Sequence, residues 1–411
     1  MAEKAEKSDD EEEKEEKPKE NKKSKKAEGE TKAQEKEKGN SAMSVAVIII
    51  IVLLAGYVYM GVSGNSIFPV QQNPDKSQIK IGFMGPLTGD AASYGHGIKR
   101  GVDLAFKDSG LENVKIIYED TKCDGKEAVN AINKLINIDG VVAIVGEVCS
   151  GATLAAAPVA EENKIVLITP SSTSPGLTKA GDYVFRTIPS DTLQGKFAAN
   201  LIYGMNITNL SILYGNEEYG IGLKDSLKED FEILGGKVVS AETFERGSTD
   251  LRTQITKIRS SKPQAIYIVS NSPDSAVAAL KQIKQLGLRV KLFGSEGLKG
   301  PEVASEKSAQ GLIITSVSAG TTKFVEEYYD EYGLAAEPFS PQGYDAFTAL
   351  AKTLKEGAST GDQIKENIYK LEFDGASGKI AFDNNGDVSG NYDVYKLGNK
   401  TFVLQQYGEF G

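Results

Sequence analysis

The chain has 411 residues, with 47 Lys and Arg against 57 Asp and Glu, a single histidine and two cysteines. The net charge of −10 excludes nucleic acid as a natural partner, and one histidine excludes metal sites built on imidazole. The length is sufficient for two lobes that each bury a core.

The first 77 residues differ in composition from the rest. Residues 1–41 are almost all Lys, Glu, Asp, Ala and Ser, which predicts a disordered, charged cytoplasmic tail. Residues 42–62 are uncharged, and a helix of about 21 residues spans roughly 31 Å, the thickness of a bilayer core. Because many lysines precede this segment, we predict a single transmembrane signal anchor with the C-terminal domain outside the cytoplasm. A cleaved signal peptide remains the alternative. Residues 63–77 are predicted to be a linker.

From Gln78 onward, strand and helix patterns alternate in two runs. The first run predicts strands at Ile79–Met84, Val114–Glu119, Val141–Val145, Ile165–Ile168 and Tyr183–Thr187, and helices at Tyr94–Asp108, Glu127–Asn137 and Gly151–Asn163. The second predicts helices at Thr192–Tyr203, Gly222–Leu234, Leu251–Arg259 and Asp274–Leu286, and strands at Leu210–Leu213, Lys237–Phe244, Ala265–Val269, Lys291–Phe293 and Leu312–Thr315. Helices at Thr322–Tyr332 and Tyr344–Glu356 follow, then a hairpin-like end at Lys379–Phe382, Tyr392–Leu397 and Thr401–Leu404. The alternation predicts an α/β fold of two doubly wound parallel-sheet lobes with a ligand cleft between them.

Two loops rich in small, hydroxyl-bearing residues follow neighbouring predicted strands. They are Cys149–Thr153 and Thr169–Pro175, and the first leads into a predicted helix. Open α/β sheets bind ligands at the carboxyl ends of their strands. Amides and hydroxyls beside a helix start suit a carboxylate. The pattern therefore predicts a binder of a small anionic or zwitterionic solute.

Both cysteines, Cys123 and Cys149, follow apolar runs and so lie at one edge of the predicted sheet. Outside the cytoplasm we expect a disulfide between them. The alternative is a nucleophilic Cys149, which would need a base, and the only histidine is His96.

Motifs typical of enzymes are missing from the sequence. It contains no phosphate-binding Gly-x-x-x-x-Gly-Lys-Ser and no Gly-x-Ser-x-Gly nucleophile elbow. We therefore predict no enzymatic activity, no cofactor and no metal.

Several segments together resemble the branched-chain amino-acid binding proteins of the type I periplasmic binding protein family. The similar segments, in chain order from Gln78 to the C-terminus, are Ile79–Gly89, Glu119–Asp124, Gly146–Ser150, Thr169–Pro175, Glu218–Gly220 and Gly294–Gly297. The resemblance implies three crossover hinges, near Thr187–Ser190, Ser316–Gly320 and Ala376–Gly378. It implies that residues 78–188 with 318–377 form the first lobe, and residues 189–317 with 378–411 form the second.

The resemblance also implies roles for individual residues. Ser150 and Thr173 would hold the α-carboxylate of an amino acid. The Ser172 carbonyl and Glu296 would hold its α-ammonium. Three more residues complete the implied ligand-binding set: Tyr219 closing from the second lobe, Tyr94 lining the side-chain pocket, and Asn271 at a position where relatives often carry an aromatic residue.

The sequence thus predicts a membrane-anchored, extracytoplasmic protein that captures an amino acid, branched-chain or related, for an ABC-type importer. Its predicted partners are the amino acid, a permease in the same membrane, and the membrane itself through one N-terminal helix. The alternative is the ligand-binding ectodomain of an amino-acid sensor or receptor.

Overall fold

The structure is a computed structural model and describes residues 78–405. The predicted tail, transmembrane anchor and linker over residues 1–77 lie outside the described residues. Between residues 78 and 405, no helix is both long enough and apolar enough to cross a membrane.

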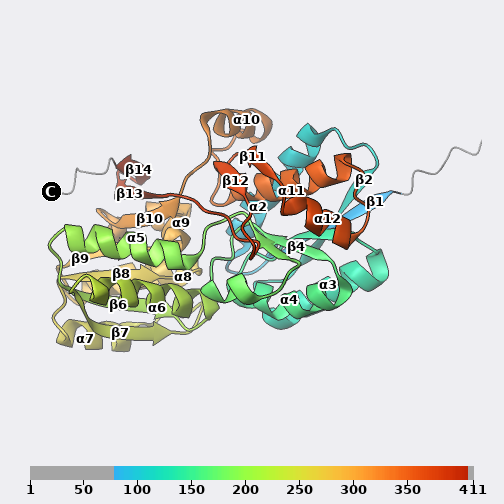
Figure 1. Ribbon diagram of the computed structural model, residues 1–411. Coiled ribbons are helices and arrows are strands. Elements are labelled where there is room, and N and C mark those ends of the chain that lie inside the picture. The colour runs from blue at the N-terminus through green and yellow to red at the C-terminus, as the bar shows by residue number, and fades with distance from the viewer. Residues whose placement is uncertain (1–77, 406–411) are drawn as a thin grey trace, which may run out of the picture. The chain divides into compact units, whose positions relative to one another are not determined.

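The first third of the described chain forms a parallel sheet, which with its helices we call lobe 1 (Figure 1). Its strand order is β2-β1-β3-β4-β5, and every strand pair is parallel. The central strands are buried along their whole length, as expected for a sheet covered on both faces. The strands are β1 (Ile79–Gly85), β2 (Val114–Asp120), β3 (Ala143–Gly146), β4 (Val166–Thr169) and β5 (Val184–Arg186).

Helices cover both faces of this sheet. Figure 1 shows α3 and α4 below it, with α2, α11 and α12 above it. The helix α11 packs along α2 although about 240 residues separate them, and a Cβ on Gly101 would lie 2.0 Å from the Ser340 carbonyl oxygen. The helices are α2 (Ala92–Ser109), α3 (Gly125–Lys134), α4 (Ser150–Asn163), α10 (Thr322–Tyr332), α11 (Ser340–Lys355) and α12 (Gly361–Ile368).

Local sequence explains where these helices begin and end. The carboxylate of Asp124 accepts the amides of Lys126 and Glu127 at 2.9 and 3.0 Å, which caps α3. After α3 the chain continues as a short π-helix, η1 (Leu135–Asp139), so the helix expected over Glu127–Asn137 changes its winding at Leu135. The helix α11 begins at Ser340, four residues before the predicted start at Tyr344. Pro341 lies in its first turn, where a helix accepts a proline.

The second sheet, with its helices, forms lobe 2. Its strand order is β14-β13-β10-β9-β8-β6-β7. The strands are β6 (Asn209–Gly215), β7 (Lys237–Phe244), β8 (Ala265–Val269), β9 (Lys291–Gly294), β10 (Ile313–Val317), β13 (Tyr392–Gly398) and β14 (Thr401–Gln405). The helices are α5 (Asp191–Gly204), α6 (Glu218–Ile233), α7 (Arg252–Ser260), α8 (Pro273–Gln285) and the short α9 (Pro301–Ser305).

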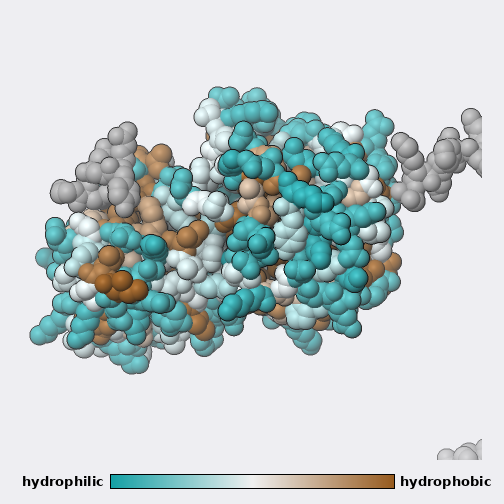
Figure 2. Space-filling view, in the orientation of Figure 1, coloured by the Kyte–Doolittle hydropathy of each residue, from teal (hydrophilic) through white to brown (hydrophobic). Residues whose placement is uncertain are grey.

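The sheet of lobe 2 is mixed, whereas the sequence predicted a parallel one. The strand β13 pairs antiparallel with β10, and β14 pairs antiparallel with β13 through a two-residue turn at Asn399 and Lys400. Such a short turn can join only antiparallel strands. Figure 2 shows a hydrophobic patch near this end of the sheet, where Val403 and Leu404 of β14 are more than half exposed.

The last part of the chain returns to lobe 1 for longer than predicted. The segment Lys379–Ala381 forms β12, which pairs with the unpredicted strand β11 (Glu372–Asp374). Ile380, Phe382 and Val388 pack in the core of lobe 1. The chain therefore crosses to lobe 2 after Val388, not near Ala376–Gly378 as expected, because these apolar side chains fill lobe 1.

Candidate functional site

A small cavity of about 30 Å³ lies between the two lobes. Its wall on lobe 1 consists of Tyr94, Val148, Cys149, Ser150, Ser171 and Phe339, and its wall on lobe 2 consists of Tyr219, Asn271, Glu296 and Gly297. The structure thus brings together five of the seven residues that the sequence singled out.

On lobe 1, the cavity faces the start of α4. Cys149 is the N-cap residue and Ser150 the first residue of this helix, and both are buried. The first amides of a helix have no acceptor within it, and they carry its positive partial charge. The Ser150 hydroxyl accepts the Ser174 amide at 3.2 Å, which leaves its own proton free to donate. This corner of the cavity therefore suits a carboxylate.

The loop before α4 is fixed by a buried carboxylate. Glu147 accepts the Thr121 hydroxyl and the Cys149 amide. Burial raises the pKa of Glu147 to about 7. From the other side, the Ser171 hydroxyl donates to the Val148 carbonyl at 2.7 Å. The donors at the start of α4 are thereby held in position before any ligand arrives.

Two predicted residues do not line the cavity. The Ser172 hydroxyl lies 2.6 Å from the Thr153 hydroxyl, and the Thr173 hydroxyl donates to Asp191 at 2.9 Å. The Ser172 side chain is buried inside lobe 1, the Thr173 side chain is buried at the junction with α5 of lobe 2, and Ser171 lines the cavity in their place. Loop composition predicted hydroxyls at this strand end but could not decide which of three consecutive residues faces the cleft.

On lobe 2, Glu296 forms an acidic corner. It lies in a short 3-10 helix, η3 (Glu296–Leu298), directly after β9, and is only 3% exposed. Its carboxylate accepts the Gln194 side-chain amide and, at 3.0 Å, the Tyr219 hydroxyl. Burial raises the pKa of Glu296 to about 7. Burial, together with repulsion from the nearby Glu296 carboxylate, also holds the pKa of Asp191 well above its usual range.

No cation neutralises this corner within the described part of the chain: Glu296 has no Lys or Arg partner at salt-bridge distance there. The nearest lysine in sequence, Lys299, instead has its ammonium 3.4 Å from the ring centroid of Tyr395. A buried carboxylate with hydrogen-bond donors but no counter-charge is a good acceptor for a ligand ammonium.

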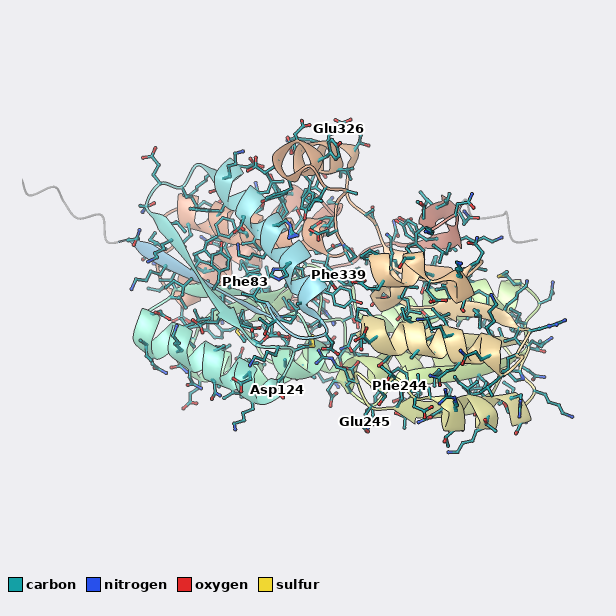
Figure 3. The ribbon with its side chains drawn as sticks, turned by 180° about the vertical axis from the view of Figure 1, so that it is seen from behind. Phe83, Asp124, Phe244, Glu245, Glu326 and Phe339 are labelled. Carbon is teal, nitrogen blue, oxygen red and sulfur yellow. A yellow bond between two sulfur atoms is a disulfide. The ribbon has the colours of Figure 1, made fainter. Side chains whose placement is uncertain are left out.

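Between these polar corners the cavity is aromatic and apolar. Tyr94 and Phe339 lie edge to face with ring centroids 5.9 Å apart. Figure 3 shows Phe339 at the junction of the two lobes. The amide of Asn271 donates to Glu217 at 2.7 Å, so this position adds a polar group where an aromatic ring was expected in relatives.

Two sets of contacts link the two lobes beside the cavity. Tyr94 donates to the Gly297 carbonyl of lobe 2 at 2.6 Å. Arg246, which follows β7 of lobe 2, pairs with Asp90 of lobe 1 and donates to the Cys123 carbonyl at 3.0 Å.

Cys123 and Cys149 form the predicted disulfide, with Cα atoms 5.5 Å apart, which rules out a free nucleophilic thiol at Cys149.

Comparison with known proteins decides the family. A family model described as periplasmic binding protein matches residues 78–401. The chain is 30% identical over 336 residues to a leucine-, isoleucine-, valine-, threonine- and alanine-binding protein of Pseudomonas aeruginosa, covering 77% of this chain and 88% of that protein. It is 26% identical over 361 residues to the Leu/Ile/Val-binding protein of Escherichia coli, covering 82% of this chain and 93% of that protein.

Solved structures agree. The leucine-binding protein LivK of Thermotoga maritima superposes with a TM-score of 0.75 at 30% identity, covering 80% of this chain and 98% of that chain. The substrate-binding protein LivJ of Streptococcus pneumoniae, solved with isoleucine, superposes with a TM-score of 0.73 at 27% identity. The match covers 80% of this chain and 100% of that chain. The chain belongs to the type I periplasmic binding protein family. Within this family it falls in the branched-chain amino-acid group, whose members bind substrates and are not enzymes.

As a periplasmic binding protein, the chain has site residues that its sequence did not reveal. Gln194 supports Glu296 from the first turns of α5, and Phe339 enters the cavity from the loop before α11. Gln194 lies eight residues after the end of β5, inside a helix, and Phe339 precedes a helix, so a search of the loops directly after strands did not include either residue. Phe339 has a positive φ of 63°, which in a bulky residue is rare, and nothing in the sequence signals it.

Proposed function

We propose that this protein captures a free amino acid outside the cytoplasm and presents it to an ABC-type importer. The observation that carries the proposal is the pairing of two opposite corners in one cavity. The amides at the start of α4 and the Ser150 hydroxyl suit a carboxylate, and the buried carboxylate of Glu296 suits an ammonium. A zwitterion complements both corners at once.

Each predicted residue takes a role in this proposal, with two corrections. Ser150 holds the α-carboxylate and Glu296 the α-ammonium, while Tyr219 orients Glu296 through its hydroxyl. Tyr94 and Asn271 bound the side-chain pocket. The hydroxyl of Thr173, which donates to Asp191, is withdrawn from the carboxylate site, and Ser171 replaces Ser172 at the cavity wall.

The class of amino acid rests on relatives and on the cavity wall. The names of two relatives state leucine, isoleucine and valine as ligands, and one adds threonine and alanine. Val148 and Phe339 offer an apolar surface to such side chains, whereas Asn271 adds a hydrogen-bonding group. We propose a small aliphatic amino acid, with room for a hydroxyl-bearing one.

The cellular setting is part of the same proposal. The uncharged segment 42–62 anchors the chain in the membrane, and the ligand-binding part lies outside the cytoplasm, where the Cys123–Cys149 disulfide is stable. The anchor is tested by carbonate extraction of native membranes, followed by N-terminal sequencing. A mature N-terminus near residue 63 would replace the anchor with a cleaved signal peptide.

Calorimetry on the full-length protein in detergent tests the ligand. The panel contains leucine, isoleucine, valine, threonine and alanine, each beside its deaminated acid. We expect micromolar or tighter binding of at least one amino acid and a loss of about 30-fold or more for its deaminated partner. Equal binding of both would exclude the ammonium site, and co-purification with a protein other than a permease would favour the sensor alternative.

A further inference from the structure

A second cavity, of about 300 Å³, adjoins the first. Glu296 and Phe339 line both, so these two side chains form the partition between them. Its walls come from both lobes: residues 335–339 of lobe 1, and residues 299–301, 316–319 and 400–402 of lobe 2. A molecule bound here would contact both lobes without occupying the amino-acid site.

Apolar side chains make up much of this wall, with the hydroxyl groups of Ser316, Ser318 and Thr401 among them. The apolar residues include Val317, Ala319, Ala336, Pro338, Pro341 and Phe402. The surface therefore suits a molecule with a short apolar body and a polar end.

The cavity also contains a cation that lacks an acceptor. Lys299 contacts the Tyr395 ring, but within residues 78–405 its ammonium has no carboxylate at salt-bridge distance and no hydrogen-bond acceptor. Burial lowers the pKa of Lys299 to about 8, although Asp393 acts in the opposite direction. A cation over a ring keeps three N–H donors that the ring does not satisfy. Lys400, from the turn between β13 and β14, lines the same cavity.

One of the two carboxylates of this wall is neutralised. Glu337 pairs with Arg100, with 3.1 Å between its oxygen and the arginine Nε, and it accepts the Tyr328 hydroxyl at 2.6 Å. Glu296 accepts only from the neutral donors Gln194 and Tyr219. Lys299 and Lys400, neither of which has a carboxylate at salt-bridge distance within residues 78–405, outnumber Glu296, so the net charge of the second cavity is positive.

We propose that the second cavity binds a small organic anion, a monocarboxylate with a short apolar body, and that Lys299 is its counter-charge. The inference goes beyond the amino-acid site. Because the ligand would bridge the lobes, it would favour the closed form and so tighten amino-acid binding, and the amino acid would tighten anion binding by the same factor.

The probe is butanoate, which is not the deaminated form of any amino acid in the panel above, and its uncharged analogue butanamide is the matched control. Both are titrated into the full-length protein by calorimetry, in the wild type and in three variants. Lys299→Met removes the charge but keeps an apolar stem, Lys299→Arg keeps the charge, and Ser150→Ala alters a residue that lines the first cavity and not the second. Thermal melting confirms that each variant is folded.

We expect the carboxylate to bind and the amide not to bind. Lys299→Met should weaken carboxylate binding about tenfold or more, whereas Lys299→Arg and Ser150→Ala should change it less than about threefold. Absence of binding, equal binding of the amide, or loss in Ser150→Ala but not in Lys299→Met would overturn the proposal. Amino-acid binding measured on the same samples separates this result from a failure of the proposed function.

Discussion

Tyr94 of lobe 1 donates its hydroxyl proton to the carbonyl of Gly297 of lobe 2, with 2.6 Å between the two oxygens. Gly297 has to be a glycine, because a Cβ there would lie 2.2 Å from the Ser270 carbonyl oxygen. This close fit places the accepting carbonyl beside η3, so one hydrogen bond ties the ligand cavity to the closure of the lobes.

Replacing Tyr94 with Phe keeps the ring against Phe339 and removes this bond. One buried hydrogen bond contributes about 0.5–1.5 kcal/mol, so we expect amino-acid affinity to fall about 2- to 13-fold. The loss should lie mainly in a faster dissociation rate, measured by stopped-flow fluorescence. A slower association with unchanged dissociation would contradict a closing role.

The pair Asp90–Arg246 provides a second clasp. Its side chains are 28% and 21% exposed, so solvent screens the attraction and we expect a coupling energy of about 1 kcal/mol or less. A double-mutant cycle with Asp90→Asn and Arg246→Gln, read as ligand dissociation rate, measures it. The exposed pair Asp250–Arg252, within lobe 2, is the control and should show no effect on dissociation.

The two corners of the cavity should respond unequally to substitution. Glu296→Gln leaves a ligand ammonium without its counter-charge and should cost about 2–5 kcal/mol, or about 30- to 4,000-fold in affinity. Ser150→Ala should cost tenfold or less, because the amides at the start of α4 remain. Calorimetry checks both, with Glu326→Gln on the outer surface of α10 as the control (Figure 3). Wild-type affinity in Glu296→Gln would disprove the ammonium site.

Amino-acid affinity should depend on pH through Glu296. Burial raises the pKa of its carboxyl to about 7 in the free protein, and a bound ammonium favours the ionised form. Affinity should therefore fall as the pH drops below about 7, approaching tenfold per pH unit, and level off above about pH 8. Burial also raises the pKa values of Glu147 and Glu217 to about 7. Glu296→Gln distinguishes among the three, because it should abolish the dependence only if Glu296 is responsible.

The stability of the ligand-free protein should depend on pH in the opposite sense to the affinity: it should fall as the pH rises. A carboxyl whose pKa rises on folding contributes its stability at low pH, and that contribution is lost as the pH rises through the folded value, here about 7. Melting temperatures of the ligand-free protein should therefore decline as the pH rises from about 4.5, near the pKa of an unfolded glutamate, to about 7, and level off above that, and saturating amino acid should reduce the decline.

The disulfide should stabilise lobe 1 substantially. It closes a loop with a sequence separation of 26 residues, worth about 3.5 kcal/mol in the chain-entropy model. The double variant Cys123→Ser/Cys149→Ser should lose about this much free energy of unfolding in urea. It should also bind amino acids more weakly, since the bridge fixes Cys149 at the N-cap position of α4 and holds Cys123, whose carbonyl accepts Arg246. Unchanged stability would show that lobe 1 holds this loop without the bridge.

Much of the architecture could be predicted from the sequence because periodic apolar patterns mark buried strands and helices. The strands β7 and β8 and the helix α10 have the predicted bounds. The helix α12 was missed, although Thr360 accepts the Gln363 amide as an N-cap that a capping search could have found. Pairing partners were harder: the strand β11 is short and only partly buried, so nothing in its own pattern distinguishes it from a loop.

The site residues could be predicted only in part, because the sequence pattern locates strand ends but not the direction of each side chain in the turn that follows. Ser150, Tyr219, Asn271 and Glu296 all follow strands, and parallel strands bring their carboxyl ends to one edge. The turn after β4 places Ser171, not Ser172 or Thr173, at the cavity, and side-chain direction within a turn depends on dihedral angles that composition does not encode.

The pairing of α2 with α11 has a consequence for the order in which the protein is made. Ribosomes complete the sheet of lobe 1 with β5, but α11, which covers that sheet beside α2, is translated more than 150 residues later. During that interval the whole of the parallel run of lobe 2 emerges, and it can fold first. Both lobes are completed only after α11 is made, lobe 2 by β13 and β14, so until then the uncovered apolar face of lobe 1 is a surface that chaperones or an export machinery would meet on the nascent chain.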